Sequence, residues 1–324
     1  MPGTKPPLVP GPLPAGVHAR GARLEDADGV LAMLHAVEEI TLGGPLTTRA
    51  ELVADWQRPS VDLGRDVVVV VTDDEEVVAS AEQFNGRAFA DVRPDHWGHG
   101  IGSALAAWTE AHARTAGLAR VGQTVPTTDG AAPAQRMLAE RGYVPAWESW
   151  ILKIPLGDHL PNPALPPGVT IRSMVRPDDD LATYEVVDTA FDDWRDGDPS
   201  MGFEDWRASM LDRDDADPDL RVLAVADGAV VGAALCGIED GEGWVDALAV
   251  THRHRRQGLG AALLHEAFLR FRDRGLATGA LSTDSRTGAL SLYQRVGMQV
   301  SESFVRMSLP LDQPAPTPAP TPVP

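Results

Sequence analysis

The chain has 324 residues, of which 43% are hydrophobic and 23% charged, and its formal net charge is −19 at pH 7. This length suits two domains that each bury a core, whereas the strongly negative field repels phosphate and excludes nucleic acid and anionic membranes as main partners. The single cysteine excludes an internal disulfide, and the lack of a membrane-length apolar segment or a signal-peptide core predicts a cytoplasmic protein.

The first part of the chain reads as alternating strands and helices. Residues 1–14 are rich in proline and glycine, and we expect a flexible lead-in. A short strand, a helix beginning at Asp26 and a second helix after the capping signal Thr47-Thr48-x-x-Glu51 follow. Residues 66–84 predict a hairpin, and the strand after it, 87–92, runs into a glycine-containing loop and a helix.

A proline-rich segment divides the chain. Residues 156–168 contain four prolines, which cannot continue a helix or a central strand. We therefore predict a first domain over 15–155, a linker over 156–168 and a second domain over 169–309. Residues 310–324 are again proline-rich and predict a disordered tail.

The second domain repeats the first. Residues 92–105 and 250–263 share one pattern at an offset of 158 residues, and Gly142 matches Gly297 at an offset of 155. Two copies of one unit at this spacing predict two domains rather than one large sheet.

The segment Trp244–Leu264 is the most informative part of the chain. An apolar strand, 244–250, is followed by a loop with five basic or imidazole side chains, and then by Gly258 and Gly260 at the start of a helix. The N-terminus of a helix leaves several backbone N–H groups without partners beside the positive end of the helix dipole, and such a place binds phosphate.

Three elements in this order resemble the GNAT (GCN5-related) acetyltransferase family. They are the strand ending in Leu248-Ala-Val250, the loop Arg255-x-x-Gly258-x-Gly260 and the later Leu292-Tyr293-x-x-x-Gly297-Met298. The resemblance implies an α/β fold of two tandem GNAT-like domains, each with a mixed, mostly antiparallel central sheet that is flanked by helices and contains a splayed pair of parallel strands. The two-domain layout is similar to that of mycothiol synthase relatives, although that enzyme has a glutamate where this chain has Trp244.

The resemblance also implies the reaction. The acyl donor would be acetyl-CoA, and the acceptor a primary amine of a small molecule. By position, the N–H of Val250 would face the thioester carbonyl, and the Leu248 backbone would lie along the pantetheine. Tyr293 would be the general acid, because a phenol with a pKa of about 10 stays protonated at neutral pH. The remaining cofactor contacts are expected from Arg255, Arg256, Gln257, Gly258, Leu259, Gly260, Ala261 and Ser285.

The base that activates the amine is harder to assign. Asp246 lies four residues before Val250, so strand alternation predicts that both side chains share one face with Leu248. Asp246 is therefore the candidate base, with Glu239, Glu242, His252 or a water chain as alternatives.

The first domain is expected to be catalytically degenerate. Trp97 stands at the position of Arg255, and Leu138, which cannot supply a proton, stands at the position of Tyr293. The glycines of the loop remain, so a second cofactor site is possible. It would consist of Val92, Gly98, Gly100 and Gly102.

The same residues also allow other interpretations. The pattern His252-x-His254 lacks a second pair of ligands, so no metal site is expected. A dinucleotide site is disfavoured because Leu263 occupies the third small position. Acidic and aromatic residues interleaved over 185–206 would suit a cationic amine, or they simply form a solvated loop. Two alternative functions remain open: a protein or peptide N-acetyltransferase, and a non-catalytic acyl-CoA-binding regulatory protein.

Overall fold

The computed structural model describes residues 9, 11–157, 160, 163–192, 194–195, 200–213 and 216–311. Most of the expected lead-in, part of the expected linker and most of the expected tail lie outside these residues. The division into domains at 155 and 169 stays a prediction, and we refer below to a first and a second half.

The first half contains these strands, α-helices and short 3₁₀ helices: β1 (Val17–Gly21), η1 (Leu24–Asp26), α1 (Ala27–Thr41), α2 (Arg49–Trp56), α3 (Leu63–Asp66), β2 (Val67–Thr72), β3 (Val77–Phe84), β4 (Arg87–Val92), η2 (Pro94–His96), α4 (Ile101–Thr115), β5 (Arg120–Pro126), η3 (Asp129–Ala131), α5 (Ala132–Glu140) and β6 (Val144–Pro155).

The second half repeats this order with the following elements: β7 (Val169–Ser173), α6 (Asp180–Asp192), α7 (Phe203–Met210), η4 (Pro218–Leu220), β8 (Arg221–Ala226), β9 (Ala229–Glu239), β10 (Glu242–Val250), η5 (His252–His254), α8 (Leu259–Asp273), β11 (Thr278–Asp284), α9 (Leu290–Arg295) and β12 (Gln299–Pro310).

Local sequence signals explain several of these boundaries. The Thr48 side chain accepts a hydrogen bond from the Glu51 N–H at 3.2 Å and begins α2 as an N-cap, as the capping signal predicted. The hairpin between β8 and β9 turns at Asp227 and Gly228, which both have a positive φ. This conformation is favoured in two-residue hairpins because its twist matches that of the strands.

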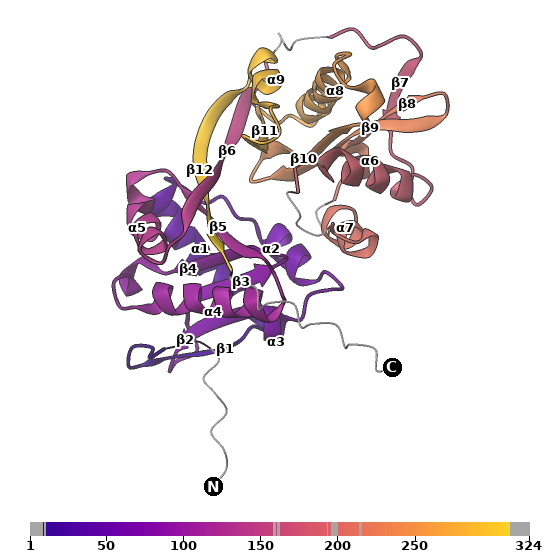
Figure 1. Cartoon of the computed structure of the whole chain (residues 1–324). Helices are drawn as coiled ribbons and strands as arrows, with labels where there is room; N and C mark the ends of the chain where they lie inside the picture. Colours follow the sequence, from indigo (N-terminus) through magenta and orange to yellow (C-terminus); the bar gives the residue numbers. More distant parts are fainter. Residues whose placement is uncertain are drawn as a thin grey trace, which may run out of the picture.

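All twelve strands form one hydrogen-bonded sheet, in the order β1-β2-β3-β4-β5-β12-β6-β11-β10-β9-β8-β7. The prediction that the two repeats do not share one large sheet is therefore wrong. The cause is an exchange of final strands, since β6 pairs antiparallel with β11 of the second half and β12 pairs with β5 of the first. The two exchanged strands also pair with each other and run side by side between the halves (Figure 1).

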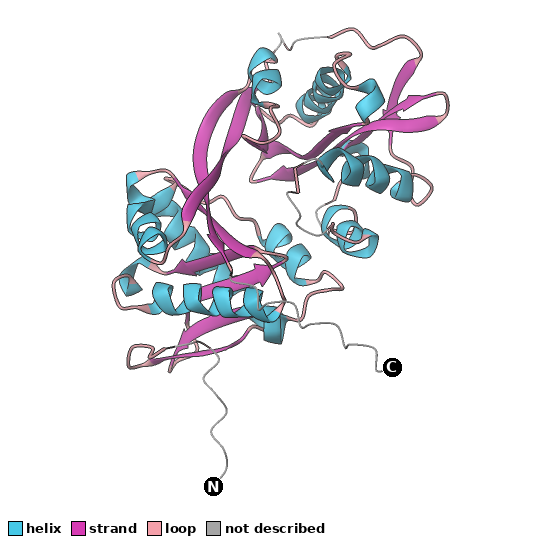
Figure 2. Ribbon diagram, viewed as in Figure 1, coloured by secondary structure: helices cyan, strands magenta, loops and turns pink. Residues whose placement is uncertain are grey.

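Each half has a core on either face of its part of the sheet (Figure 2). In the second half, α8 and α9 cover one face around Leu263 and Phe268, and α6 and α7 cover the other around Val187 and Trp206. Among the helices of the described residues, none has both the length and the apolar character that a membrane crossing requires.

The expected splayed pair of parallel strands is present in both halves. In the second half, β10 pairs with β11 only from Gly243 to Val245. In the first, β4 pairs with β5 only at Arg87 and Ala88. Beyond these short contacts the paired strands separate, so each half has an opening in its sheet, and the mixed, mostly antiparallel GNAT-like architecture is confirmed.

The packing at Gly243 gives a stability prediction. A Cβ at this position would lie 2.3 Å from Cδ2 and Cγ of the Phe271 ring, and Phe271 is fully buried. We expect Gly243→Ala to lower the free energy of unfolding by about 1–3 kcal/mol, the usual cost of overpacking a core. Chemical denaturation checks this value. Gly44→Ala is the control, because no atom lies within 4 Å of a Cβ there; equal stabilities of the two variants would contradict the packing.

Candidate active site

The opening in the second half begins at a β-bulge. The register of β10 against β9 shifts between Val245 and Ala247, so Asp246 is an extra residue in β10. The parallel pairing with β11 ends at the same point, where Val245 faces Leu281. A bulge bends its strand and increases the local twist. The separation of β10 from β11 therefore coincides with a bend in β10.

Backbone N–H groups of β10 point into this opening. The Thr251 N–H donates to the Val231 carbonyl of β9 at 2.9 Å. Because N–H groups alternate along an antiparallel strand, those of Val250 and Leu248 point away from β9, toward the side where β11 has separated. This orientation agrees with the expectation that the Val250 N–H donates to the carbonyl oxygen of the thioester.

The loop before α8 presents a second set of donors. Arg256 and Gly258 have φ values of 60° and 84°. The first intrahelical hydrogen bond of α8 is formed by the Ala262 N–H, which donates to the Gly258 carbonyl at 3.0 Å. Within the described part of the chain, the N–H groups of residues 256–261 donate to no protein acceptor. These are the amides expected to hold a diphosphate.

Arg255 lies elsewhere than expected. Its Nε donates to the Val250 carbonyl at 3.1 Å and its Nη2 to the Ala190 carbonyl at 3.1 Å, and its guanidinium lies 5.5 Å from the Trp194 ring. The guanidinium thus fixes the end of β10 to the following loop, which does not fit direct binding of a diphosphate.

The corresponding contact in the first half corrects the interpretation of Trp97. Its indole N–H donates to the carbonyl of Val92, the residue that matches Val250. The separation of the strands leaves this carbonyl without a partner in the sheet, so a side-chain donor satisfies it in each half. Trp97 is therefore a structural equivalent of Arg255 and no sign of a lost site.

Ser285 also departs from the expectation. Its N–H donates to the Glu148 carbonyl at 2.8 Å, and its hydroxyl accepts from the Glu148 N–H at 3.3 Å. Glu148 belongs to β6, which lies on the side of β11 opposite β10. The hydroxyl therefore extends the pairing of β11 with β6, and its direction does not fit a contact to a cofactor beside β10.

Tyr293 lies in α9 and packs into the core beside α8. Burial raises the pKa of its phenol to about 12, an effect that the Thr283 side chain partly offsets. Thr283 belongs to the part of β11 beyond the pairing with β10, so the phenol adjoins the opening and remains protonated at neutral pH. The matching residue of the first half, Leu138, is buried in the core.

The bulge overturns the predicted direction of Asp246. Alternation placed it on the face of Leu248, but the extra residue turns its side chain toward the side of α7. There, Asp246 Oδ1 lies 3.8 Å from Arg213 Nη1, and Glu239 Oε1 lies 3.2 Å from Arg213 Nη2. Leu248 is on the other side, where its Cδ2 would lie 3.9 Å from a Cβ at Gly260.

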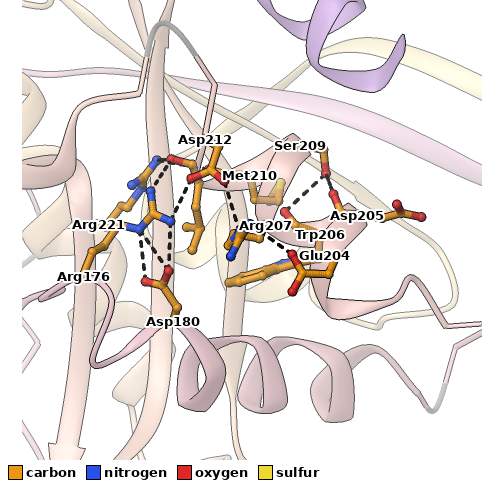
Figure 3. A network of polar contacts seen from close by, with 11 residues as sticks. Arg176, Asp180, Glu204, Asp205, Trp206, Arg207, Ser209, Met210, Asp212 and Arg221 are labelled. Atoms are coloured by element: carbon orange, nitrogen blue, oxygen red, sulfur yellow. Dashed lines mark hydrogen bonds and ion pairs between the residues drawn. The ribbon is translucent and has the colours of Figure 1, made fainter. Parts of the chain in front are cut away.

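A polar network holds the segment that carries Arg213 (Figure 3). The buried Arg221 donates to the carbonyls of Met210 and Leu211 at 3.2 and 2.9 Å, at the end of α7. Arg176 donates to the same Leu211 carbonyl at 2.9 Å and pairs with Asp180 and Asp212. Sequence reasoning missed this network because its members are far apart in the chain and form no local pattern.

Within the described residues, the acidic and aromatic segment 185–206 does not form the cation site that was one of its two interpretations. The rings of Tyr184, Phe203 and Trp206 pack against one another, and Trp206 is buried. Asp192 pairs with Arg195, and Glu204 with Arg207. Three further acids of this segment, Asp193, Asp196 and Asp198, lie outside the described residues.

Comparison with known proteins gives matches across both halves. The model of the acetyltransferase (GNAT) family matches residues 45–143 and 183–298. A mycothiol acetyltransferase of Tsukamurella paurometabola is 31% identical over 68% of this chain and 77% of its own length. Another mycothiol acetyltransferase, from Streptomyces avermitilis, is 32% identical over 65% of this chain and 68% of its own length.

Solved structures agree with these matches. A GCN5-related N-acetyltransferase from Sphaerobacter thermophilus is 32% identical, with a TM-score of 0.72 over 92% of this chain and 97% of its own. A tandem GNAT protein from the clavulanic acid biosynthesis pathway has a TM-score of 0.66 at 17% identity, covering 91% and 98%, and it supports the fold alone.

The left-handed glycine before α8 gives a prediction about cofactor binding. Alanine at Gly258, where φ is 84°, would strain the loop by about 1–2 kcal/mol and shift the amides. We expect Gly258→Ala to raise the KM for acetyl-CoA about tenfold or more, because a hydrogen bond to a charged group is worth about 1.5–3 kcal/mol. Steady-state kinetics measures the change.

The matched control is Gly275→Ala. Gly275 has a φ of 77° and follows the other end of α8, so it carries the same backbone strain without adjoining the loop. We expect its KM for acetyl-CoA to stay at the wild-type value. A similar rise in KM in both variants would argue against a direct role of the loop.

Proposed function

Because this chain belongs to the GNAT acetyltransferase family, and is thus an acyltransferase that uses acetyl-CoA and acetylates an amine, we propose that its acceptor is the primary amine of a small molecule. We further propose that the reaction takes place at the opening beside β10 and α8. The family assignment favours an enzyme over the alternative of a non-catalytic acyl-CoA-binding protein.

The carbonyl oxygen of the thioester is the first group that needs stabilisation. Attack by a neutral amine places negative charge on this oxygen, and a fixed donor aimed at it accelerates acyl transfer by about 10²–10³. The Val250 N–H is the donor that we propose, with the Leu248 backbone beside the pantetheine. The observation that carries this proposal is the orientation of both N–H groups away from β9, which follows from the bond between Thr251 and Val231.

Tyr293 acts on the leaving thiolate in this proposal. A phenol with a pKa of about 12 is a weaker acid than a thiol with a pKa of about 8.5. Complete transfer of its proton to the thiolate would cost about 5 kcal/mol. We therefore assign Tyr293 the role of a hydrogen-bond donor that stabilises the thiolate, with the final proton supplied from water or the acceptor.

The diphosphate of the cofactor would bind the unpaired amides before and within the first turn of α8. The donors are those of Arg256, Gln257, Gly258, Leu259, Gly260 and Ala261. Gly258 is the position that requires glycine, because its φ is positive. At Gly260 a Cβ would lie 3.5 Å from Leu292 Cδ2, an ordinary contact, so the protein itself leaves room there for a small side chain.

The space between the halves supports a small acceptor. A cleft of about 310 Å³ lies between α2 and the segment after α7, and Arg213, which pairs with Asp246 at the bulge, lines it. This volume is near the lower limit of about 300 Å³ for small-molecule sites. Relatives named for mycothiol also support a small molecule as the acceptor. Because Trp244 stands where mycothiol synthase has a glutamate, we do not assign the acceptor of that enzyme and propose small primary amines in general.

The first half retains the geometry of a second cofactor site. Gly98 and Gly100 have φ values of 78° and 87° before α4. The backbone N–H of Arg93 donates to the Val78 carbonyl at 2.8 Å. Because N–H groups alternate along the strand, the Val92 N–H then points toward the opening. Gly102 lies in the first turn of α4. We propose binding without catalysis here, because Leu138 offers no donor to a thiolate.

Substitution of Tyr293 tests the mechanism. We expect Tyr293→Phe to lower kcat about 10²-fold or more, as removal of a positioned donor does, with the KM for acetyl-CoA nearly unchanged. A thiol-release assay with acetyl-CoA and a panel of amines measures both. Tyr143→Phe is the matched control, since burial also raises the pKa of Tyr143 to about 12 but it lies in the first half. Equal activities of both variants and the wild type would remove Tyr293 from the mechanism.

A further inference from the structure

Two arginines, one after each of the separated strands, hold the segment that follows α6. Arg255, after β10, donates from Nη2 to the Ala190 carbonyl at 3.1 Å, and its guanidinium lies 5.5 Å from the Trp194 ring. Arg286, after β11, donates from Nη1 to the Trp194 carbonyl at 2.8 Å. The segment with Trp194 therefore bridges the gap between the ends of β10 and β11, on the face of the sheet that α6 covers.

Arg286 is itself held on two sides. Its Nε and Nη2 donate to the two carboxylate oxygens of Asp284 at 3.2 and 2.6 Å, and a bidentate pair of this kind fixes the plane of the guanidinium. The guanidinium also lies 3.7 Å from the centre of the Trp147 ring, within the range of a cation–π contact. Trp147 belongs to β6, the strand that the first half contributes beside β11. Arg286 thus keeps the Trp194 carbonyl at a set distance from β11.

Trp194 lies close to the expected position of the thioester carbonyl. The Arg255 guanidinium that contacts the Trp194 ring also donates from Nε to the Val250 carbonyl at 3.1 Å. One side chain therefore joins Trp194 to the residue whose N–H is the proposed donor. The indole is partly buried and lies edge-on to the Phe191 ring, with ring centres 5.6 Å apart. The group attached to the attacking nitrogen would lie beside this indole.

The first half has a shorter form of the same contact. The offset of 158 residues between the repeats makes Thr128 the equivalent of Arg286. The strand pairing agrees, since the residue before each of them donates its N–H to the exchanged strand. The Thr128 hydroxyl donates to the carbonyl of Thr41, the last residue of α1, at 2.6 Å. A threonine thus makes the contact directly in the first half, whereas an arginine makes it at the length of its side chain in the second.

Two equivalent glycines show the resulting difference in width. A Cβ at Gly130 would lie 2.3 Å from the carbonyl oxygen of Ile40, so the loop after β5 meets the end of α1 backbone to backbone. At Gly288, the equivalent position after β11, a Cβ would have no atom of the described residues within 4 Å. The helix end and the loop therefore touch in the first half and stand apart in the second, where Arg286 and Trp194 lie between them.

We propose that Trp194, held over the opening by Arg255 and Arg286, selects the acceptor amine by size, an inference that rests on the proposed function. The indole limits the room for the group that the amine nitrogen carries, and the two arginines keep the ring from moving aside. Arg286 is a positioning residue, because it acts through Trp194. The first half takes part in this selection through Trp147, against which the Arg286 guanidinium packs.

The test compares acceptors of increasing bulk, from ethylamine through butylamine to cyclohexylamine, by thiol release from acetyl-CoA. We expect the ratio of kcat/KM for cyclohexylamine to kcat/KM for ethylamine to rise about tenfold or more in Trp194→Ala. The reason is that a single methylene group in an apolar pocket already changes kcat/KM about 10–200-fold. The KM for acetyl-CoA should stay near the wild-type value, because the indole lies on the face of the sheet opposite α8.

Arg286→Lys is a second variant, which leaves the indole intact. Lysine keeps the positive charge but cannot bind both Asp284 oxygens and the Trp194 carbonyl with one planar group. We expect the same ratio to rise, by less than in Trp194→Ala. A merely structural role of either residue would lower kcat/KM for all three amines by one factor and leave the ratio unchanged.

Phe89→Ala is the control, because it removes an exposed aromatic side chain from β4 of the first half, and it should keep the wild-type ratio. Circular dichroism and melting temperature verify that each variant is folded, and Arg286→Lys decides the outcome should Trp194→Ala not fold. If the wild type acetylates these amines and the ratio is the same in the variants, size selection by Trp194 is overturned alone. If the wild type acetylates no primary amine, the proposed function fails and this inference fails with it.

Discussion

The separation of β10 from β11 is the constraint on which the rest of the site depends. A continuous parallel ladder would pair the N–H groups of Leu248 and Val250 with β11, and no donor would remain for a ligand. This ladder ends after Val245, next to the bulge at Asp246. The same bulge turns the Asp246 carboxylate toward α7, away from the face on which the Leu248 side chain lies.

The unpaired carbonyl at the end of the strand shows how the fold accommodates such an opening. Val250 and Val92 each receive a hydrogen bond from a side chain five residues later, Arg255 in one half and Trp97 in the other. A guanidinium and an indole have different chemistry but both reach the carbonyl with an N–H. The two halves therefore keep one backbone geometry while they differ in the group beside the opening, Tyr293 or Leu138.

The exchange of β6 and β12 makes the halves parts of one sheet. Each half depends on the other for the strand next to β5 or β11, and β6 and β12 pair along most of their length. This arrangement holds α2 of the first half beside α7 of the second.

The amino-acid sequence by itself determined the features that depend on neighbouring residues. These are the strand, loop and helix order around Gly258, the N-cap at Thr48, the hairpin turn at Asp227-Gly228 and the family that these motifs indicate. Their conformations follow from local φ preferences and from hydrogen bonds within a few residues.

The tertiary structure decided what depends on pairing between distant segments. Alternation along β10 predicted the wrong face for Asp246. The bulge depends on the register of β10 against β9, and the residue pattern of β10 alone gives no information about that register. The partners of Arg255 and Ser285 and the exchange of final strands likewise arise only when segments up to about 190 residues apart meet. Contacts of this kind carry no local sequence signal, because the free energy that fixes them comes from the packing of whole elements.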